Sequence, residues 1–264
     1  QVLKAPQPTG VDSQGHGVQG TLVAEKTSER HYRVRVAMES AGVSFPVLLD
    51  PSWVSAGSMA TARMLHTATK LGSGKVLVVG GSGSAGQDLT SAELYDPTTN
   101  SWSATGSLAT GRSYSSASNL SNGKVLVVGG QNNGGSTASA ELYDPGTNTW
   151  SVAPSLGVAR SLHTASLLDN SKVLITGGFV GNVLATAELY NPATDNWTGA
   201  PPMATARYLH GVAVLSDGKL IVSGGQDSGN NSLGSTELYN PATNSWSGAP
   251  PMLTARFNHT ATLL

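Results

Sequence analysis

Short apolar runs separated by glycine-, asparagine- and proline-rich stretches follow one another along most of the chain. A clear example is the run Val76–Val79, which ends at the glycine pair Gly80-Gly81. Such a run without polar alternation predicts a strand that is buried on both faces, as in a sheet stacked between two others. No apolar run approaches the roughly 18 residues needed to span a bilayer, so we expect no membrane insertion.

These runs belong to an internal repeat. An arginine, a double glycine, a Glu-Leu-Tyr triplet and a tryptophan recur in phase, about 48 residues apart. The arginines that mark the units are Arg63, Arg112, Arg160, Arg207 and Arg256, and the tryptophans are Trp53, Trp102, Trp150, Trp197 and Trp246. We place the units at 63–107, 112–155, 160–202 and 207–251, followed by a partial unit at 256–264.

Each unit is predicted to form four short antiparallel strands. The first strand follows the arginine, as at 65–71, the second is the apolar run, the third carries Glu-Leu-Tyr, and the tryptophan begins the fourth. Tight hairpin turns are expected at Asn122-Gly123 and Asp217-Gly218. Turns with proline and a left-handed asparagine lead to each tryptophan. Repeated four-stranded units of this length fit a β-propeller better than a sandwich.

The units resemble kelch repeats, in which an arginine-led inner strand with a nearby histidine precedes a double glycine and then a spaced tyrosine and tryptophan. The resemblance covers 59–264 and implies an all-β, kelch-type β-propeller of four-stranded antiparallel blades. We expect four complete blades plus the first strand of another. The Ser/Thr/Asn-rich repeats also resemble those of bacterial kelch proteins that are exported, which implies a secreted or cell-surface location.

Residues 1–50 lack the repeat markers and are predicted to form an N-terminal β segment, whereas 51–264 form the propeller. Strands are expected at 31–38, 43–49 and 53–56. In one interpretation these strands join 256–264 and close a five-bladed ring. In the other, the chain is a fragment of a larger propeller and 1–50 are the tail of a preceding β domain.

Composition excludes several classes of function. Charged residues make up 12% of the chain and nearly cancel to a net charge of −1, which argues against a nucleic-acid partner. Cysteine is absent, so a disulfide framework, a thiolate zinc site and a cysteine nucleophile are impossible. Copper radical oxidases of the kelch type need a cysteine linked to a tyrosine and are therefore disfavoured. We expect no cofactor.

The recurring polar residues suggest structural roles. Histidine occupies an Arg-X-X-His position in most units, and Ser115 replaces it in the second; we interpret these histidines as hydrogen-bonding groups and not as a metal site. One glutamate also recurs in each complete unit, which predicts a buried Glu–Arg pair. Because a catalytic acid is needed once and not once per blade, we assign no catalytic residue. The residues are His66, His163, His210 and His259, with Glu93, Glu141, Glu188 and Glu237.

The loop after the glycine pair differs in every unit, and variable loops on a rigid scaffold are where recognition usually resides. These loops span 82–90, 131–137, 179–185 and 226–234. Because a meander alternates its loops between two faces, we expect the residue after each arginine to lie on the same face. The candidate binding residues are Met64, Gln87, Asp88, Gln131, Asn132, Asn133, Phe179, Asn182, Tyr208, Gln226, Asp227, Asn230 and Phe257.

The leading hypothesis is a non-enzymatic recognition module that binds a protein or glycan through these loops. One alternative is a sugar-modifying propeller enzyme, which should show a cluster of non-repeated carboxylates or histidines at one channel mouth. The other is an architectural spacer in a surface protein, which should show near-identical loops and no pocket.

Overall fold

The computed structural model describes residues 3–4, 9–11, 17–28, 31–38, 48–50 and 56–263, and before residue 56 it describes only the backbone. The chain forms two compact units, Gln1–Ala56 and Gly57–Leu264. The described part of the chain consists of strands, turns and loops. No helix in it is long and apolar enough to cross a membrane.

The first unit contains one antiparallel sheet. Its strands are β1 (Leu3–Lys4), β2 (Thr9–Val11), β3 (Gly17–Ser28), β4 (His31–Met38) and β5 (Leu48–Asp50). The order is β1-β3-β2-β5, and β4 also pairs with β3. The strand predicted at 31–38 is confirmed as β4, whereas β3, its long partner, was not predicted. Residues 43–47 and 53–55 of the other two predicted strands, including Trp53, lie outside the described residues.

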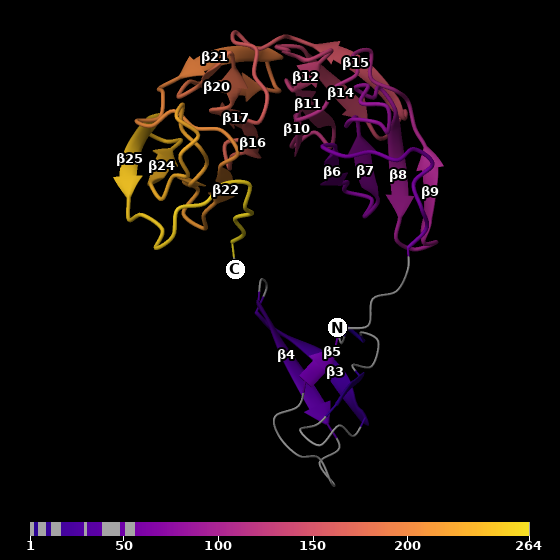
Figure 1. The fold of residues 1–264 in the computed structure, drawn as a ribbon. Helices are drawn as coiled ribbons and strands as arrows, with labels where there is room; N and C mark the ends of the chain where they lie inside the picture. The colour runs from indigo at the N-terminus through magenta and orange to yellow at the C-terminus, as the bar shows by residue number, and fades with distance from the viewer. Residues whose placement is uncertain are drawn as a thin grey trace. The chain divides into compact units, whose positions relative to one another are not determined.

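The second unit is built from four four-stranded antiparallel sheets, which lie side by side along an arc (Figure 1). Each sheet is a simple meander, as the repeat predicted. Blade 1 consists of β6 (Thr67–Lys70), β7 (Val76–Val79), β8 (Ala92–Asp96) and β9 (Ser101–Ala104). Blade 2 consists of β10 (Ser116–Asn119), β11 (Val125–Val128), β14 (Ala140–Asp144) and β15 (Thr149–Ala153). Blade 3 consists of β16 (Thr164–Leu167), β17 (Val173–Thr176), β20 (Ala187–Asn191) and β21 (Asn196–Ala200). Blade 4 consists of β22 (Gly211–Val214), β23 (Leu220–Ser223), β24 (Thr236–Asn240) and β25 (Ser245–Ala249).

The first strand of each blade is shorter than the sequence predicted. In blade 1 the ladder starts at Thr67 and not at Leu65, because Leu65 has a left-handed backbone with a φ of 58°. The hairpin turn that follows is a three-residue loop in blade 2, where the amide of Gly123 donates to the carbonyl of Leu120. Gly123 has a positive φ of 83°, which glycine adopts without strain, and Ser171 adopts a φ of 64° at the equivalent position of blade 3.

The blades are joined by apolar contacts between neighbouring sheets. One cluster contains Leu77 and Val79 of blade 1 together with Val127 and Tyr143 of blade 2. The central apolar strands are almost completely buried, which confirms the interpretation of the four-residue runs. Trp150 packs against this cluster and donates its indole N–H to the carbonyl of Gly106, 2.7 Å away, in the segment that precedes blade 2.

The predicted Glu–Arg pair is present in all four blades. The Nη2–Oε1 distances are 2.8–2.9 Å, and the arginine side chains are fully buried. The predicted left-handed asparagine in the turn before the tryptophan is confirmed at Asn100, Asn148 and Asn244, and Asp195 takes this position in blade 3.

The fifth unit differs from its prediction. Residues 256–263 contain no strand, although the amide of Gly225 donates to the carbonyl of Arg256 as it does at the equivalent blade junctions. A first strand is held by pairing with a second strand, and the partial unit offers none. The two alternatives for ring closure remain predictions.

Candidate functional site

The loop face is organised by one repeated backbone pairing. The residue after each arginine pairs with the residue after the glycine pair of its own blade: Met64 with Ser82, Ser113 with Gln131, Ser161 with Phe179, and Tyr208 with Gln226. The base of every variable loop is therefore fixed beside the inner edge of its blade. The alternation of loops in a meander predicted that the residue after the arginine and the variable loop lie on the same face, and these four pairs confirm it.

The four described loops differ in form as well as in sequence. Blade 2 carries a small hairpin, β12 (Gln131–Asn132) and β13 (Gly135–Ser136), and blade 3 carries another, β18 (Phe179–Val180) and β19 (Asn182–Val183). The loops of blades 1 and 4 are two residues longer, and each contains one isolated bridge, Ser82 with Asp88 and Gln226 with Ser232. The four-stranded sheets are therefore the same in every blade, whereas the loops that follow the glycine pairs vary.

The loops of blades 3 and 4 bring candidate residues together. The rings of Phe179 and Tyr208 are tilted at 54° with centroids 6.0 Å apart, a geometry typical of a favourable aromatic pair. The Tyr208 hydroxyl donates to the side-chain oxygen of Asn230 at 2.9 Å. The side-chain amide of Gln226 donates to the backbone carbonyl of Asn230 at 3.2 Å. Because both rings are half-buried, they are fixed in place and still reach the surface. We call these four residues the aromatic patch.

A second junction joins the loops of blades 1 and 2. The backbone amide of Asn133 donates to Oδ2 of Asp88 at 2.9 Å, and the side chain of Asn132 donates to the carbonyl of Gly111 at 2.6 Å. Asp88 thus serves to hold two loops together. Asp227, in blade 4, caps its own turn by accepting from the amides of Gly229 and Asn231, so hydrogen bonding lowers its pKa below the ordinary value.

The other candidates lie apart from these two junctions. Met64 and Phe257 are 58% and 44% exposed, and they belong to the first and last units of the arc. Gln87 and Asn182 are exposed in their own loops. The sequence analysis placed all the candidate binding residues on one face. In the structure, contacts between blades bring some of them together at two separate junctions.

Inside the loop face, a chain of backbone hydrogen bonds runs from blade to blade. The amide of Tyr114 donates to the carbonyl of Leu65, that of Leu162 to Tyr114, that of Leu209 to Leu162, and that of Asn258 to Leu209, at 2.8–3.2 Å. Each of these residues has a left-handed backbone. The sequence analysis did not predict this feature, because leucine, which occupies three of the five positions, has no preference for a left-handed backbone.

The recurring histidines tie each blade to the one before it. Nε2 of His163 lies 2.7 Å from the hydroxyl of Ser116, and Nε2 of His210 lies 3.0 Å from the hydroxyl of Thr164. Burial, reinforced by nearby positive charge such as that of Arg160 beside His163, lowers the pKa of both imidazoles to about 3. The hydrogen-bonding role is as predicted, and among the described residues no group of three or more acids or histidines is arranged to hold a metal.

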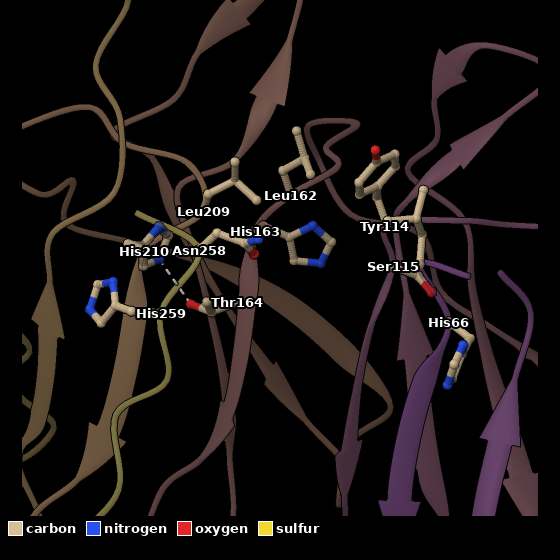
Figure 2. A pocket seen from close by; sticks show the side chains of 11 residues that line it. His66, Tyr114, Ser115, Leu162, His163, Thr164, Leu209, His210, Asn258 and His259 are labelled. Atoms are coloured by element: carbon tan, nitrogen blue, oxygen red, sulfur yellow. Dashed lines mark hydrogen bonds between the residues drawn. The ribbon is translucent and has the colours of Figure 1, made fainter. Parts of the chain in front are cut away.

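These histidines and the left-handed residues line a pocket of about 240 Å³ at the inner edges of the blades. Figure 2 shows the side chains of His66 and Ser115 on one side of it, with the imidazole of His163 across the space and His210 and His259 beyond. All described residues that line it are uncharged or histidine. The pocket therefore offers hydrogen-bonding groups without a fixed charge.

The meander blades, their apolar central strands and the arginine-glutamate pairs together define a β-propeller of the kelch class. The Kelch_KLHDC2_KLHL20_DRC7 model, described as the KLHDC2/KLHL20/DRC7 Kelch-repeats domain, matches residues 52–217, and a Kelch motif matches 206–253. The chain belongs to this family of kelch-repeat domains.

A solved structure described as "Structure of YjhT" is similar in fold. It superposes with a TM-score of 0.66 over 97% of this chain and 87% of that chain, at 15% sequence identity. At this identity the likeness supports the kelch-propeller fold and no particular activity. No curated protein matches the chain.

Proposed function

We propose that this protein is a non-enzymatic recognition module that binds a protein partner through the loop face of its propeller. The observation that carries the proposal is the aromatic patch, in which Phe179 of one blade and Tyr208 of the next form a ring pair beside the polar groups of Asn230. Half-buried aromatic side chains held by a rigid scaffold are the residues that most often dominate binding energy at protein interfaces.

Two further observations support a protein partner. Kelch repeats generally mediate protein interactions. The loops also differ between blades in both sequence and backbone form, whereas the sheets beneath them are nearly identical. A glycan partner is the second possibility for the same surface, because aromatic rings with adjacent amides also stack on sugars.

The rival functions have less support. A sugar-modifying enzyme needs an acid or base that is not repeated in every blade, and the described residues that line the pocket at the inner edges of the blades include no carboxylate. An architectural spacer does not need loops of different form. We propose, from the resemblance to bacterial exported kelch proteins and from the absence of cysteine, that the protein is bacterial and is secreted or attached to the cell surface.

The test is a selection from a peptide-display library and a glycan array with the whole chain, repeated with the double variant Phe179→Ala/Tyr208→Ala. We expect selected peptides to bind the double variant more than about tenfold more weakly, since interface hot spots contribute 2 kcal/mol or more. Val152→Ala is the matched control, because Val152 is 79% exposed on the outer strand β15.

Replacing loops 179–185 and 226–234 tests the surface as a whole. Retained binding after both replacements would show that the partner does not use the aromatic patch. Enrichment of glycans and no peptides would overturn the protein partner and leave the surface assignment intact.

A further inference from the structure

The junction between blades 1 and 2 differs from the junction between blades 3 and 4 on the face opposite the variable loops. The turns after the first and third strands share that face, because a meander alternates its loops. In blade 3 the turn after the first strand carries Asp169, whose Oδ2 lies 2.8 Å from the position of a Cβ built on Gly218 of blade 4. The side chain of Asp169 therefore reaches across the junction to the turn of the next blade.

Gly72 takes the place of Asp169 in the turn of blade 1. The backbone hydrogen bonds of the two turns are the same, so the positions correspond. A Cβ built on Gly72 would have nothing within 4 Å, and the same holds for Gly123, which corresponds to Gly218 in blade 2. The junction between blades 1 and 2 therefore lacks the side chain that fills this space in blade 3.

The space forms a pocket of about 470 Å³ between the turns of blades 1 and 2, which we call the junction pocket. This volume lies within the roughly 300–1,000 Å³ that is typical of small-molecule sites. Leu71, Leu94 and Tyr143 contribute to its lining, and so do the exposed residues Gly72 and Gly146. Because Leu71 and Tyr143 are buried, the pocket has an apolar floor below a rim of glycines.

Among the described residues that line the junction pocket, Lys75 alone is charged. Its Nζ lies 3.2 Å from Oδ2 of Asp96, and its side chain is 43% exposed. An ammonium group has three donors, so the pair with Asp96 leaves others for a ligand. Asn148 adds a second donor, because its Oδ1 accepts from the hydroxyl of Tyr143 at 2.7 Å and its amide nitrogen remains. The lining therefore suits a ligand with an apolar body and an anionic group.

We propose that the junction pocket binds a free, small apolar carboxylic acid, such as an aromatic acid, whose carboxylate pairs with Lys75. The apolar part of the ligand packs on Leu71 and Leu94, where it gains contact area, and Lys75 selects the sign of the charge. The junction pocket lies on the face opposite the aromatic patch and does not depend on the function proposed for that patch.

The experiment measures binding of cinnamate to the whole chain by calorimetry and saturation-transfer NMR. Cinnamyl alcohol and cinnamylamine serve as the neutral and cationic probes of the same shape. We expect saturable binding of cinnamate that is about three- to fivefold tighter than that of the alcohol, since a partly exposed ion pair adds modestly to affinity. The amine should bind most weakly. The absence of saturable cinnamate binding, or binding no tighter than that of the alcohol or the amine, would overturn the proposal.

Three variants localise the site. Gly72→Asp supplies the side chain that blade 3 carries and should weaken cinnamate binding by about tenfold or more, because it fills the junction pocket and repels an anion. Lys75→Met keeps an apolar stem and should lower the affinity for cinnamate to that for the alcohol. Lys124→Met is the matched control, since it breaks the equivalent 3.2 Å pair with Asp144 in blade 2 and Lys124 does not line the junction pocket.

The control should bind cinnamate as the wild type does, and thermal unfolding checks that all three variants are folded. Equal binding of cinnamate by the wild type and Lys75→Met would contradict the assignment even if Gly72→Asp fails to fold. Phe179→Ala/Tyr208→Ala should bind cinnamate as the wild type does, which separates this proposal from the loop-face function.

Discussion

The carboxylate of Glu141 and the guanidinium of Arg112 lie 2.8 Å apart inside blade 2, and the arginine side chain is completely buried. The carboxylate also accepts from the backbone amides of Ala109 and Thr110 at 2.7 and 3.2 Å. The guanidinium donates to the carbonyl of Gly129 at 2.9 Å. One ion pair thus joins the entry segment of the blade, its third strand and the glycine pair.

Glu141→Gln should lower the free energy of unfolding by about 3 kcal/mol, because it leaves the buried charge of Arg112 without its counter-ion. The matched control is Asp96→Asn, which breaks the partly exposed Lys75–Asp96 pair of 3.2 Å and should cost much less, because solvent screens an exposed ion pair. Urea unfolding of both variants measures the difference. Equal losses would contradict the structural role of the buried pair.

Gly129→Ala should destabilise the protein by more than about 2 kcal/mol. Gly129 has a φ of 62°, and a Cβ there would lie 2.5 Å from the carbonyl oxygen of Arg160 and 2.6 Å from the ring of His163. Gly72→Ala is the control, since nothing lies within 4 Å of its Cβ position and its φ is not positive. A melting temperature of Gly129→Ala close to that of the control would show that the backbone at this blade junction accommodates a methyl group without losing stability.

Stability should fall as the pH is lowered below about 6.5. Burial and the charge of Arg160 lower the pKa of His163 to about 3 in the folded state, so between about pH 6.5 and 3 the unfolded chain binds more protons. Each such histidine removes about 1.4 kcal/mol of stability between neutral pH and pH 5.5. His163→Gln should lose less stability over this interval, as measured by denaturant unfolding at pH 7.5 and 5.5. An unchanged pH dependence would show that His163 is not buried in its neutral form.

Trp150→Phe should cost about 1–2 kcal/mol. The indole N–H of Trp150 donates to the carbonyl of Gly106 at 2.7 Å, and its ring lies 5.1 Å from that of Tyr143. Phenylalanine keeps an aromatic contact and leaves that carbonyl without its donor. Thermal unfolding checks the loss, with the exposed Val152→Ala as a control that should change the melting temperature little. A larger effect at Val152 would contradict the role of Trp150 in joining blade 2 to the segment that precedes it.

Much of the propeller follows from local patterns. The run Val125–Val128 is buried because it has no polar position, and Asn148 adopts a left-handed backbone because its side chain tolerates one. The limits of the first strands were wrong by two residues in blade 1, since Leu65 is left-handed despite having no sequence feature that favours this conformation. Contacts with the neighbouring blade outweigh its local preference.

The sequence by itself determined the repeat, the fold class and the pairing of one arginine with one glutamate, because each depends on residue types that recur at fixed spacing. Only the tertiary structure decided that Phe179 meets Tyr208, and that Asp88 accepts a hydrogen bond from the amide of Asn133. These relationships join different blades, and their distances depend on how twisted sheets pack against one another. The spacing of residues along the chain does not predict how neighbouring sheets pack.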